Sequence, residues 1–227
     1  MFGSFSIMKA IRITALVLLI QTITWVILMG ITTASIEPGW ESPDYVHWAA
    51  EKSTAYVINY INVSLLTLVA VILFSLLYGY VKDPARRVAF AGLILVPVYG
   101  VMNLVCYGMQ ISLVPALAAR ALAGGETMAR VSRLIQANPD SLVGYLNGLA
   151  YAILGVPSIL YGILLYRRSK KWSGALFMVN GVLCIFGIIG YAAGSKLLSA
   201  GTILGGIAFL LALAALVVEF RPGKSGT

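Results

Sequence analysis

Six long apolar stretches separated by short polar segments dominate the pattern of this chain. A helix of about 20 apolar residues crosses the hydrocarbon core of a bilayer. The pattern therefore predicts six transmembrane helices, over Ile11–Ile31, Ala55–Val81, Val88–Leu113, Val143–Tyr166, Gly174–Ala193 and Gly201–Glu219. Little sequence remains between these stretches, so we expect residues 1–227 to form a single all-α domain, a bundle of six membrane-spanning helices.

Two connections between the predicted spans are tight and basic, namely residues 82–87 and residues 167–171. Connections this short make the helices on either side antiparallel neighbours. Two other connections are longer and carry signals for short amphipathic helices. In the first, the triplet Ser42-Pro43-Asp44 predicts a helix with Ser42 as its N-cap.

The second long connection predicts an amphipathic helix over residues 126–137. Such a helix is suited to lie along a membrane surface. The segment that follows it contains Pro139 and ends at Ser141, which is placed to cap the fourth span. The apolar face of the predicted helix consists of Met128, Val131, Leu134 and Ile135, with Arg130 and Arg133 opposite.

The distribution of charge predicts the orientation in the membrane. Charged residues make up 11% of the chain, less than half of the roughly 25% typical of soluble domains. If the N-terminus lies inside, the inner side holds 11 of the 16 Lys and Arg residues, namely Lys9, Arg12, Lys82, Arg86, Arg87, Arg167, Arg168, Lys170, Lys171, Arg221 and Lys224. Lys and Arg concentrate on the cytoplasmic side of membrane proteins. We therefore expect a cell-membrane protein in contact with membrane lipid, with both termini cytoplasmic. The net charge of +8 then reflects this bias and not nucleic-acid binding.

The first span is longer than the apolar core of a signal peptide, so we interpret it as an uncleaved helix, with Met8 as an alternative start. Cys106 and Cys184 lie inside predicted spans, where cysteine usually acts as a small hydrophobic residue. Small residues let helices approach closely in lipid. Packing within the chain is the favoured interpretation of the glycines, and a homodimer through span six is the alternative. These glycines are Gly144, Gly148, Gly155 and Gly162, the pair Gly190 and Gly194, and the pair Gly201 and Gly205.

Ionisable side chains are missing from the interior of every predicted span, and Glu219 lies at the inner end of the last one. Proton relays and many ion-coupled transporters depend on such buried groups. The single histidine excludes a multi-histidine metal site, and no hydrolase or metalloprotease motif is present. We therefore expect no metal and no cofactor, and we favour a non-enzymatic protein.

Neutral polar residues gather in the outer halves of spans two, three and four. Residues three or four positions apart share one face of a helix, so Asn103, Tyr107 and Gln110 form a polar stripe. Converging stripes would line a neutral cleft that opens outwards and binds or passes a small uncharged or lipid-like ligand. The alternative is that these side chains bond across helices and hold the bundle together, at about 0.6 kcal/mol each. The candidate ligand-binding residues are Asn59, Asn62, Asn103, Tyr107, Gln110, Asn147 and Tyr151.

A second group of candidates consists of Asp44, His47 and Glu51, which share one face of the helix predicted after Ser42. Such a face could bind a metal ion or let His47 carry protons. It gives an alternative function, a membrane enzyme acting on a lipid at the outer interface with these three residues as catalytic candidates. A solvated helix at the interface is the simpler interpretation. A third hypothesis is a structural or sensor subunit of a larger membrane complex.

The layout resembles that of small prokaryotic six-helix integral membrane proteins that are grouped only as a domain of unknown function. The residues that carry the likeness are the basic N-terminal start and the two hairpins whose helices end in residues 76–87 and residues 160–168. This resemblance covers most of the chain. It implies a six-helix membrane protein and transfers no activity, cofactor or site.

Overall fold

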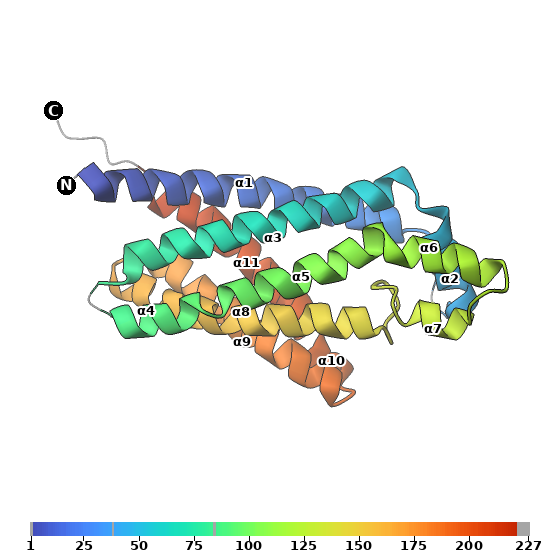
Figure 1. Cartoon of the computed structure of the whole chain (residues 1–227). Coiled ribbons are helices and arrows are strands. Elements are labelled where there is room, and N and C mark those ends of the chain that lie inside the picture. Colours follow the sequence, from blue (N-terminus) through green and yellow to red (C-terminus); the bar gives the residue numbers. More distant parts are fainter. Residues whose placement is uncertain (1, 38, 84, 222–227) are drawn as a thin grey trace. The chain divides into compact units, whose positions relative to one another are not determined.

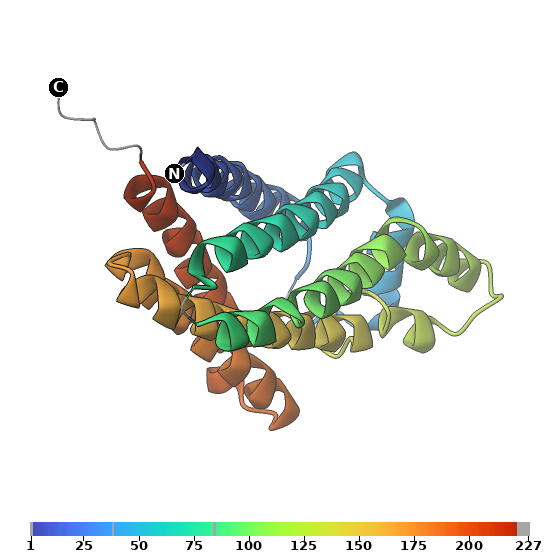
Figure 2. The same cartoon turned by 60° about the vertical axis from the view of Figure 1, so that its left-hand side comes forward.

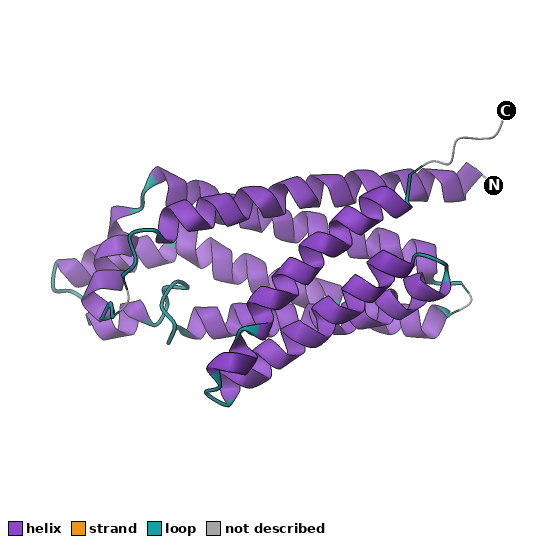
Figure 3. Cartoon of the chain, turned by 180° about the vertical axis from the view of Figure 1, so that it is seen from behind, coloured by secondary structure: helices purple, strands orange, loops and turns teal. Residues whose placement is uncertain are grey.

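The computed structural model describes residues 2–37, 39–83 and 85–221. Lys224 on the predicted inner side and residue 84 of the first basic connection therefore lie outside the described residues. The described residues are 82% helical, and no strand occurs among them (Figure 3). Its helices follow one another as shown in Figure 1. They are α1 (Phe2–Thr33), α2 (Ser42–Glu51), α3 (Thr54–Val81), α4 (Arg86–Leu93), α5 (Val96–Ile111), α6 (Leu113–Leu122), α7 (Met128–Ser132), α8 (Leu142–Arg167), α9 (Lys171–Ala192), α10 (Lys196–Ser199) and α11 (Gly201–Glu219).

Among the described residues, six helical segments are long and apolar enough to cross a membrane, which confirms the predicted all-α class and is compatible with the predicted six spans. Their orientation stays a prediction. The segments are Ser6–Thr33, Thr54–Val81, Arg86–Leu122, Leu142–Arg167, Lys171–Ala192 and Lys196–Glu219.

The third segment is not the single helix Val88–Leu113 that the sequence predicted. Helix α4 ends at Leu93, a turn follows, and α5 begins at Val96. Pro97 explains this break because it has no N–H to donate to the carbonyl of Leu93 and its ring disfavours a helical conformation for the preceding residue. A second interruption lies at Ser112, after which α6 continues to Leu122. Pro157, in contrast, lies inside α8.

Two predicted helix boundaries in the long connections are wrong. The N-cap of α2 is Glu41 and not Ser42, because Asp44 accepts the Glu41 backbone N–H at 2.8 Å in a reciprocal capping box. Helix α7 has only 5 residues instead of running over residues 126–137, because the Asn138 amide donates to the Ser132 carbonyl at 3.0 Å and the chain turns. The predicted cap of α8 is confirmed, since the Ser141 hydroxyl accepts the Gly144 N–H at 3.0 Å.

Residue contacts divide the chain into two compact units, each described here by itself. The first unit comprises Met1–Ile20, Leu68–Gly100 and Gly148–Thr227, and the second comprises Gln21–Thr67 and Val101–Asn147. Helices α1, α3, α5 and α8 each contribute residues to both units. The single domain over residues 1–227 stays a prediction.

Glycines hold α8, α9 and α11 together in the first unit, where α9 packs along α11 (Figure 2). A Cβ on Gly155 would lie 2.7 Å from the carbonyl oxygen of Gly181, and a Cβ on Gly162 would lie 2.7 Å from that of Gly174. The backbones of α8 and α9 are therefore in contact at these two points, as expected for the predicted row of glycines on α8. Its members Gly144 and Gly148 are not as tightly packed. The nearest atoms to their added Cβ positions lie at 3.4 and 3.6 Å.

The two glycine pairs predicted to pack helices, Gly190 with Gly194 and Gly201 with Gly205, have different roles. Gly190 packs against the backbone of α10, whereas Gly194 has a φ of +65° and makes the turn after α9, so it is no packing residue. Gly201 lies against the Leu183 carbonyl, and Gly205 lies against Cys184. Beside Gly205, the Asn180 amide donates to the Gly205 carbonyl at 2.9 Å and joins α9 to α11.

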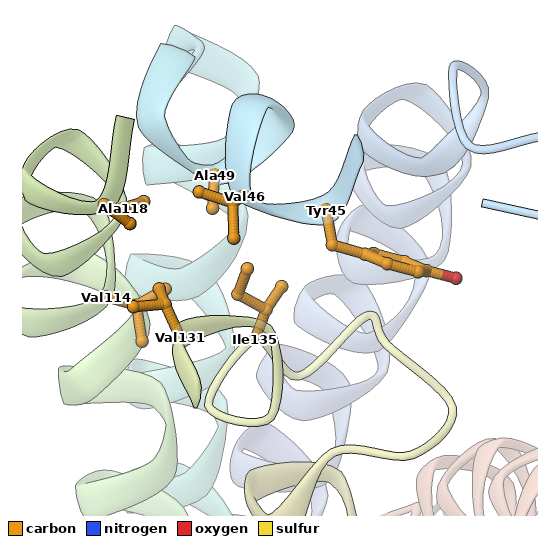
Figure 4. Close-up of a cluster of buried hydrophobic side chains, with 8 residues drawn as sticks. Tyr45, Val46, Ala49, Val114, Ala118, Val131 and Ile135 are labelled. Atoms are coloured by element: carbon orange, nitrogen blue, oxygen red, sulfur yellow. The ribbon is translucent and has the colours of Figure 1, made fainter. Parts of the chain in front are cut away.

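The second unit has a hydrophobic core at the end that carries α2, α6 and α7. Figure 4 shows Val46 and Ala49 facing side chains of α6 and Ile135. The indole N–H of Trp48 donates to the Thr32 carbonyl at 3.0 Å, which fastens α2 to the end of α1. The buried members of this core are Tyr45, Val46, Ala49, Val114, Ala118, Ala121, Val131 and Ile135.

Replacing Gly181 with Ala is expected to destabilise the protein, because the new Cβ would collide with the Gly155 carbonyl, a backbone atom that cannot rotate away. Overpacking of this kind costs about 1–3 kcal/mol, which thermal unfolding in detergent should detect as a lower melting temperature. Gly206→Ala is the control, since a Cβ there meets no atom within 4 Å. Equal effects of the two substitutions would contradict this account of helix packing.

Candidate functional site

Three amides, of which Asn103 is buried and the other two are partly buried, form a connected group in the second unit. We call this group the amide cluster: Asn103 on α5, Gln136 in the loop before α8, and Asn147 on α8. The Nδ2 of Asn147 donates to the Asn103 Oδ1 at 2.7 Å and to the Tyr107 hydroxyl at 2.9 Å. The Nε2 of Gln136 donates to the Asn147 Oδ1 at 3.1 Å. Asn147 therefore lies in the middle, with one amide on each side.

Asn103 and Tyr107 lie one helical turn apart on the same face of α5, and this face meets Asn147 near the start of α8. The Ser141 cap fixes where α8 begins. Asn103 has an exposed fraction of 0% and Tyr107 of 4%, so both polar ends are removed from the surface. Asn103, Tyr107 and Asn147 are among the predicted ligand-binding residues, and the structure brings these three together.

Gln110, one turn further along α5, has a structural role. Its Nε2 donates to the Leu134 carbonyl at 2.9 Å, and its Oε1 accepts the Gln136 backbone N–H at 3.2 Å. The Tyr56 hydroxyl donates to the Gln110 backbone carbonyl at 3.0 Å. Through these bonds Gln110 holds the loop before α8 against α5. It thereby positions Gln136, although Gln110 itself is not a member of the amide cluster.

The other predicted residues lie elsewhere. The Nδ2 of Asn62 donates to the Gln21 carbonyl at 3.0 Å, which joins α3 to α1. Asn59 is 6% exposed on the same helix. Tyr151 belongs to the first unit, where its ring centroid lies 5.7 Å from that of Tyr99. The seven residues expected to line one cleft are therefore distributed over several contacts.

Gln136 was missed by sequence reasoning. It lies in a segment interpreted as a surface helix, where a glutamine carries no special signal. A polar residue between the apolar Ile135 and Ala137 was the available indication.

Four amide atoms in the second unit are buried and have no hydrogen-bond partner: Asn103 Nδ2, Gln136 Oε1, Asn59 Oδ1 and Gln21 Oε1. Two of them terminate the amide cluster, with an unused donor on Asn103 and an unused acceptor on Gln136. Leaving a buried polar group unsatisfied costs about 1–3 kcal/mol. A neutral acceptor would satisfy the Asn103 donor, and a neutral donor would satisfy the Gln136 acceptor.

Asp44, His47 and Glu51 lie on the exposed face of α2. Asp44 already serves in the capping box. Among the described residues, no group of three His, Cys, Asp or Glu side chains is arranged to hold a metal ion. Beside them, burial raises the pKa of the Tyr45 phenol, and the carboxylates of Asp140 and Asp44 add to the increase.

A surface pocket of about 390 Å³ lies beside the start of α2. Trp40 and Tyr45 form part of its wall, with ring centroids 5.4 Å apart in an edge-to-face arrangement. Arg133 and Asp140 contribute charge to its lining. This charged hollow differs in chemistry from the neutral amide cluster, and neither His47 nor Glu51 lines it.

Neither a known protein family, nor a curated protein, nor a solved structure matches this chain. The likeness in layout to small six-helix membrane proteins stays a prediction. The site is therefore interpreted from its own geometry.

A double-mutant cycle should show that Asn103 and Asn147 act together. We expect Asn103→Ala and Asn147→Ala to be non-additive in unfolding free energy by about 0.6–1.7 kcal/mol, the range for hydrogen bonds between membrane helices. Denaturant unfolding in mixed micelles measures the four stabilities. Ser112→Ala combined with Asn147→Ala is the control, because the Ser112 hydroxyl donates to the Gly108 carbonyl of the adjoining α5 and not to α8. Strict additivity of the Asn103 pair would contradict the described contact.

Proposed function

We propose that this protein is a non-enzymatic multi-pass membrane protein that binds a small uncharged ligand at the amide cluster. The observation that carries the proposal is the unused donor of Asn103, a side chain with an exposed fraction of 0%, in the same hydrogen-bonded chain as the unused acceptor of Gln136. We further propose that the protein lies in the cell membrane with both termini cytoplasmic. The ligand site would then open towards the outside.

The arrangement of the amides supports binding over a purely structural role. An amide that only joins helices can use its groups on the protein itself, as Asn180 does when it donates to the Gly205 carbonyl of the neighbouring helix. In the amide cluster the central residue, Asn147, is fully used, whereas the two outer residues each keep one free group. Free groups at both ends are what a bridging ligand requires.

The absence of charge at the site restricts the ligand. Among the described residues, no Asp, Glu, Lys, Arg or His side chain is buried. A charged ligand would find no counter-ion, and transferring an unpaired charge from water costs far more than transferring an amide. A neutral molecule with carbonyl, hydroxyl or amide groups, including the polar head of a neutral lipid, fits these conditions.

The enzyme alternative has less support. His47 and Glu51 are exposed, and Asp44 is occupied in capping α2. A general base needs to be held within hydrogen-bond reach of a substrate group. No described contact orients the His47 ring for that task.

The proposal is tested by mass spectrometry of the small molecules that co-purify with the protein in mild detergent. We expect a discrete neutral compound with the wild type and its loss with Asn103→Leu and with Gln136→Leu, because each change removes one free group. Asn180→Leu is the matched control, as it removes a buried amide that bonds the Gly205 carbonyl. Melting temperatures measured in parallel report whether each variant is folded.

Two outcomes would overturn the proposal. One is a wild-type protein that carries only bulk lipid. The other is a co-purifying compound that both folded variants retain as well as the control does. Either result would favour the view that the amides serve to hold the helices together.

A further inference from the structure

The connections of the first unit meet at one end of that unit. Arg168 in the α8–α9 connection donates to the carbonyl of Asp83 in the α3–α4 connection. The Glu219 carboxylate at the end of α11 accepts the Ser173 hydroxyl at 2.6 Å and the Trp172 backbone N–H at 3.0 Å. Three segments far apart in the sequence therefore form one surface.

This surface is strongly basic. Its acidic residues are Asp83 and Glu219, and Glu219 is occupied by the first turn of α9, where a carboxylate compensates the helix dipole. Its basic residues are Lys82, Arg86, Arg87, Arg167, Arg168, Lys170, Lys171 and Arg221. Cations thus far outnumber the available carboxylates.

The cations fall into two groups. In the first, Arg168, Lys170 and Lys171 lie over the rings of Tyr80, Phe220 and Tyr166, at 5.3, 4.7 and 4.0 Å from the ring centroids. In the second, the side chains of Lys82, Arg86, Arg87 and Arg167 have no hydrogen bond or ion pair with any described residue. The second group is therefore available to an external anion.

Arg86 and Arg87 are the most informative members of that group. They occupy the first turn of α4, where positive charge opposes the helix dipole. Both are exposed, and the Ala85 N-cap contributes no side chain to this helix end. An exposed guanidinium group suits a phosphate, which it can bind with paired hydrogen bonds, and the two consecutive residues offer two such groups.

Large apolar side chains border this surface. Trp172 is 73% exposed, Phe90 is 53% exposed and Val88 is 46% exposed. Aromatic residues concentrate where a membrane meets water, and apolar ones face the acyl chains. An anion that binds here is therefore accompanied by hydrocarbon, which distinguishes a phospholipid from a soluble phosphate.

We propose that the basic surface around Arg86, Arg87 and Arg167 binds the phosphate of anionic phospholipids and selects them over zwitterionic ones. This inference does not depend on the ligand of the amide cluster. It assigns the exposed arginines to a lipid headgroup, in addition to any role in setting orientation.

The test uses the full chain in nanodiscs that contain equal amounts of phosphatidylcholine and phosphatidylglycerol. Native mass spectrometry of the released protein measures the ratio of the two lipids that stay bound. We expect phosphatidylglycerol to be enriched on the wild type, and the enrichment to fall by about fivefold or more in the R86Q/R87Q variant. The matched control is R130Q/R133Q, which removes two exposed arginines from the second unit and should leave the ratio unchanged.

Three outcomes would overturn the proposal. The first is a wild type that shows no enrichment. The second is an equal loss of enrichment in both double variants, which would mean that only net charge matters. The third is displacement of the bound phosphatidylglycerol by glycerol 3-phosphate added to the nanodiscs, which would indicate a site for a soluble phosphate ester. Melting in pure phosphatidylcholine nanodiscs, expected to be the same for wild type and R86Q/R87Q, shows that the loss is not a failure to fold.

Discussion

In a bilayer a polar group must find its partner within the protein, and most of this structure follows from that requirement. Helices satisfy their own backbone groups, which is why no strand occurs in the described part of the chain and the long segments are helical. Helix ends are closed by side chains: Ser141 caps α8, Asp44 and Glu41 cap α2, and Glu219 caps α9. The requirement is not met at Asn103 and Gln136 in the candidate site, nor at Gln21, Asn59 and Ser158 elsewhere in the described chain.

Association of the helices needs a second explanation, because lipid tails are as apolar as leucine and give little hydrophobic driving force. In the first unit the helices instead come into backbone contact at glycines, as at Gly155 and Gly181. Close approach increases the number of dispersion contacts and lets Asn180 reach across to the Gly205 carbonyl. The second unit contains fewer such crossings and is held at one end by a core of apolar side chains, resembling that of a soluble protein.

Features that depend on the average hydropathy of many residues, such as the number of long apolar helices, could be predicted from the sequence. Features set by a single local contact, such as the point where a helix ends, could not. Hydropathy over about 20 residues gave the number of spans, since each crosses the same thickness of hydrocarbon. It could not place the break before Val96, which depends on Pro97, or the early end of α7, which depends on the Asn138 side chain. Helical spacing placed Asn103 and Tyr107 on one face, but Gln136 reaches the same site from a loop whose path no periodicity encodes. Tyr151, chosen by the same spacing rule, belongs to the other unit.

Charged side chains and buried neutral polar side chains lie in different parts of this chain. This separation restricts which ligands each group of side chains can recognise. Formal charge is found on exposed or partly exposed side chains, where water and headgroups screen it, while buried polar residues of the described chain are all neutral. An amide can donate and accept, so a chain of amides can be extended by a ligand without moving a proton or neutralising a charge. An arginine can only donate and remains charged, so it distinguishes anions from neutral molecules. The amide cluster is therefore suited to uncharged molecules with both donors and acceptors, and the arginine surface to phosphate, for the same electrostatic reason.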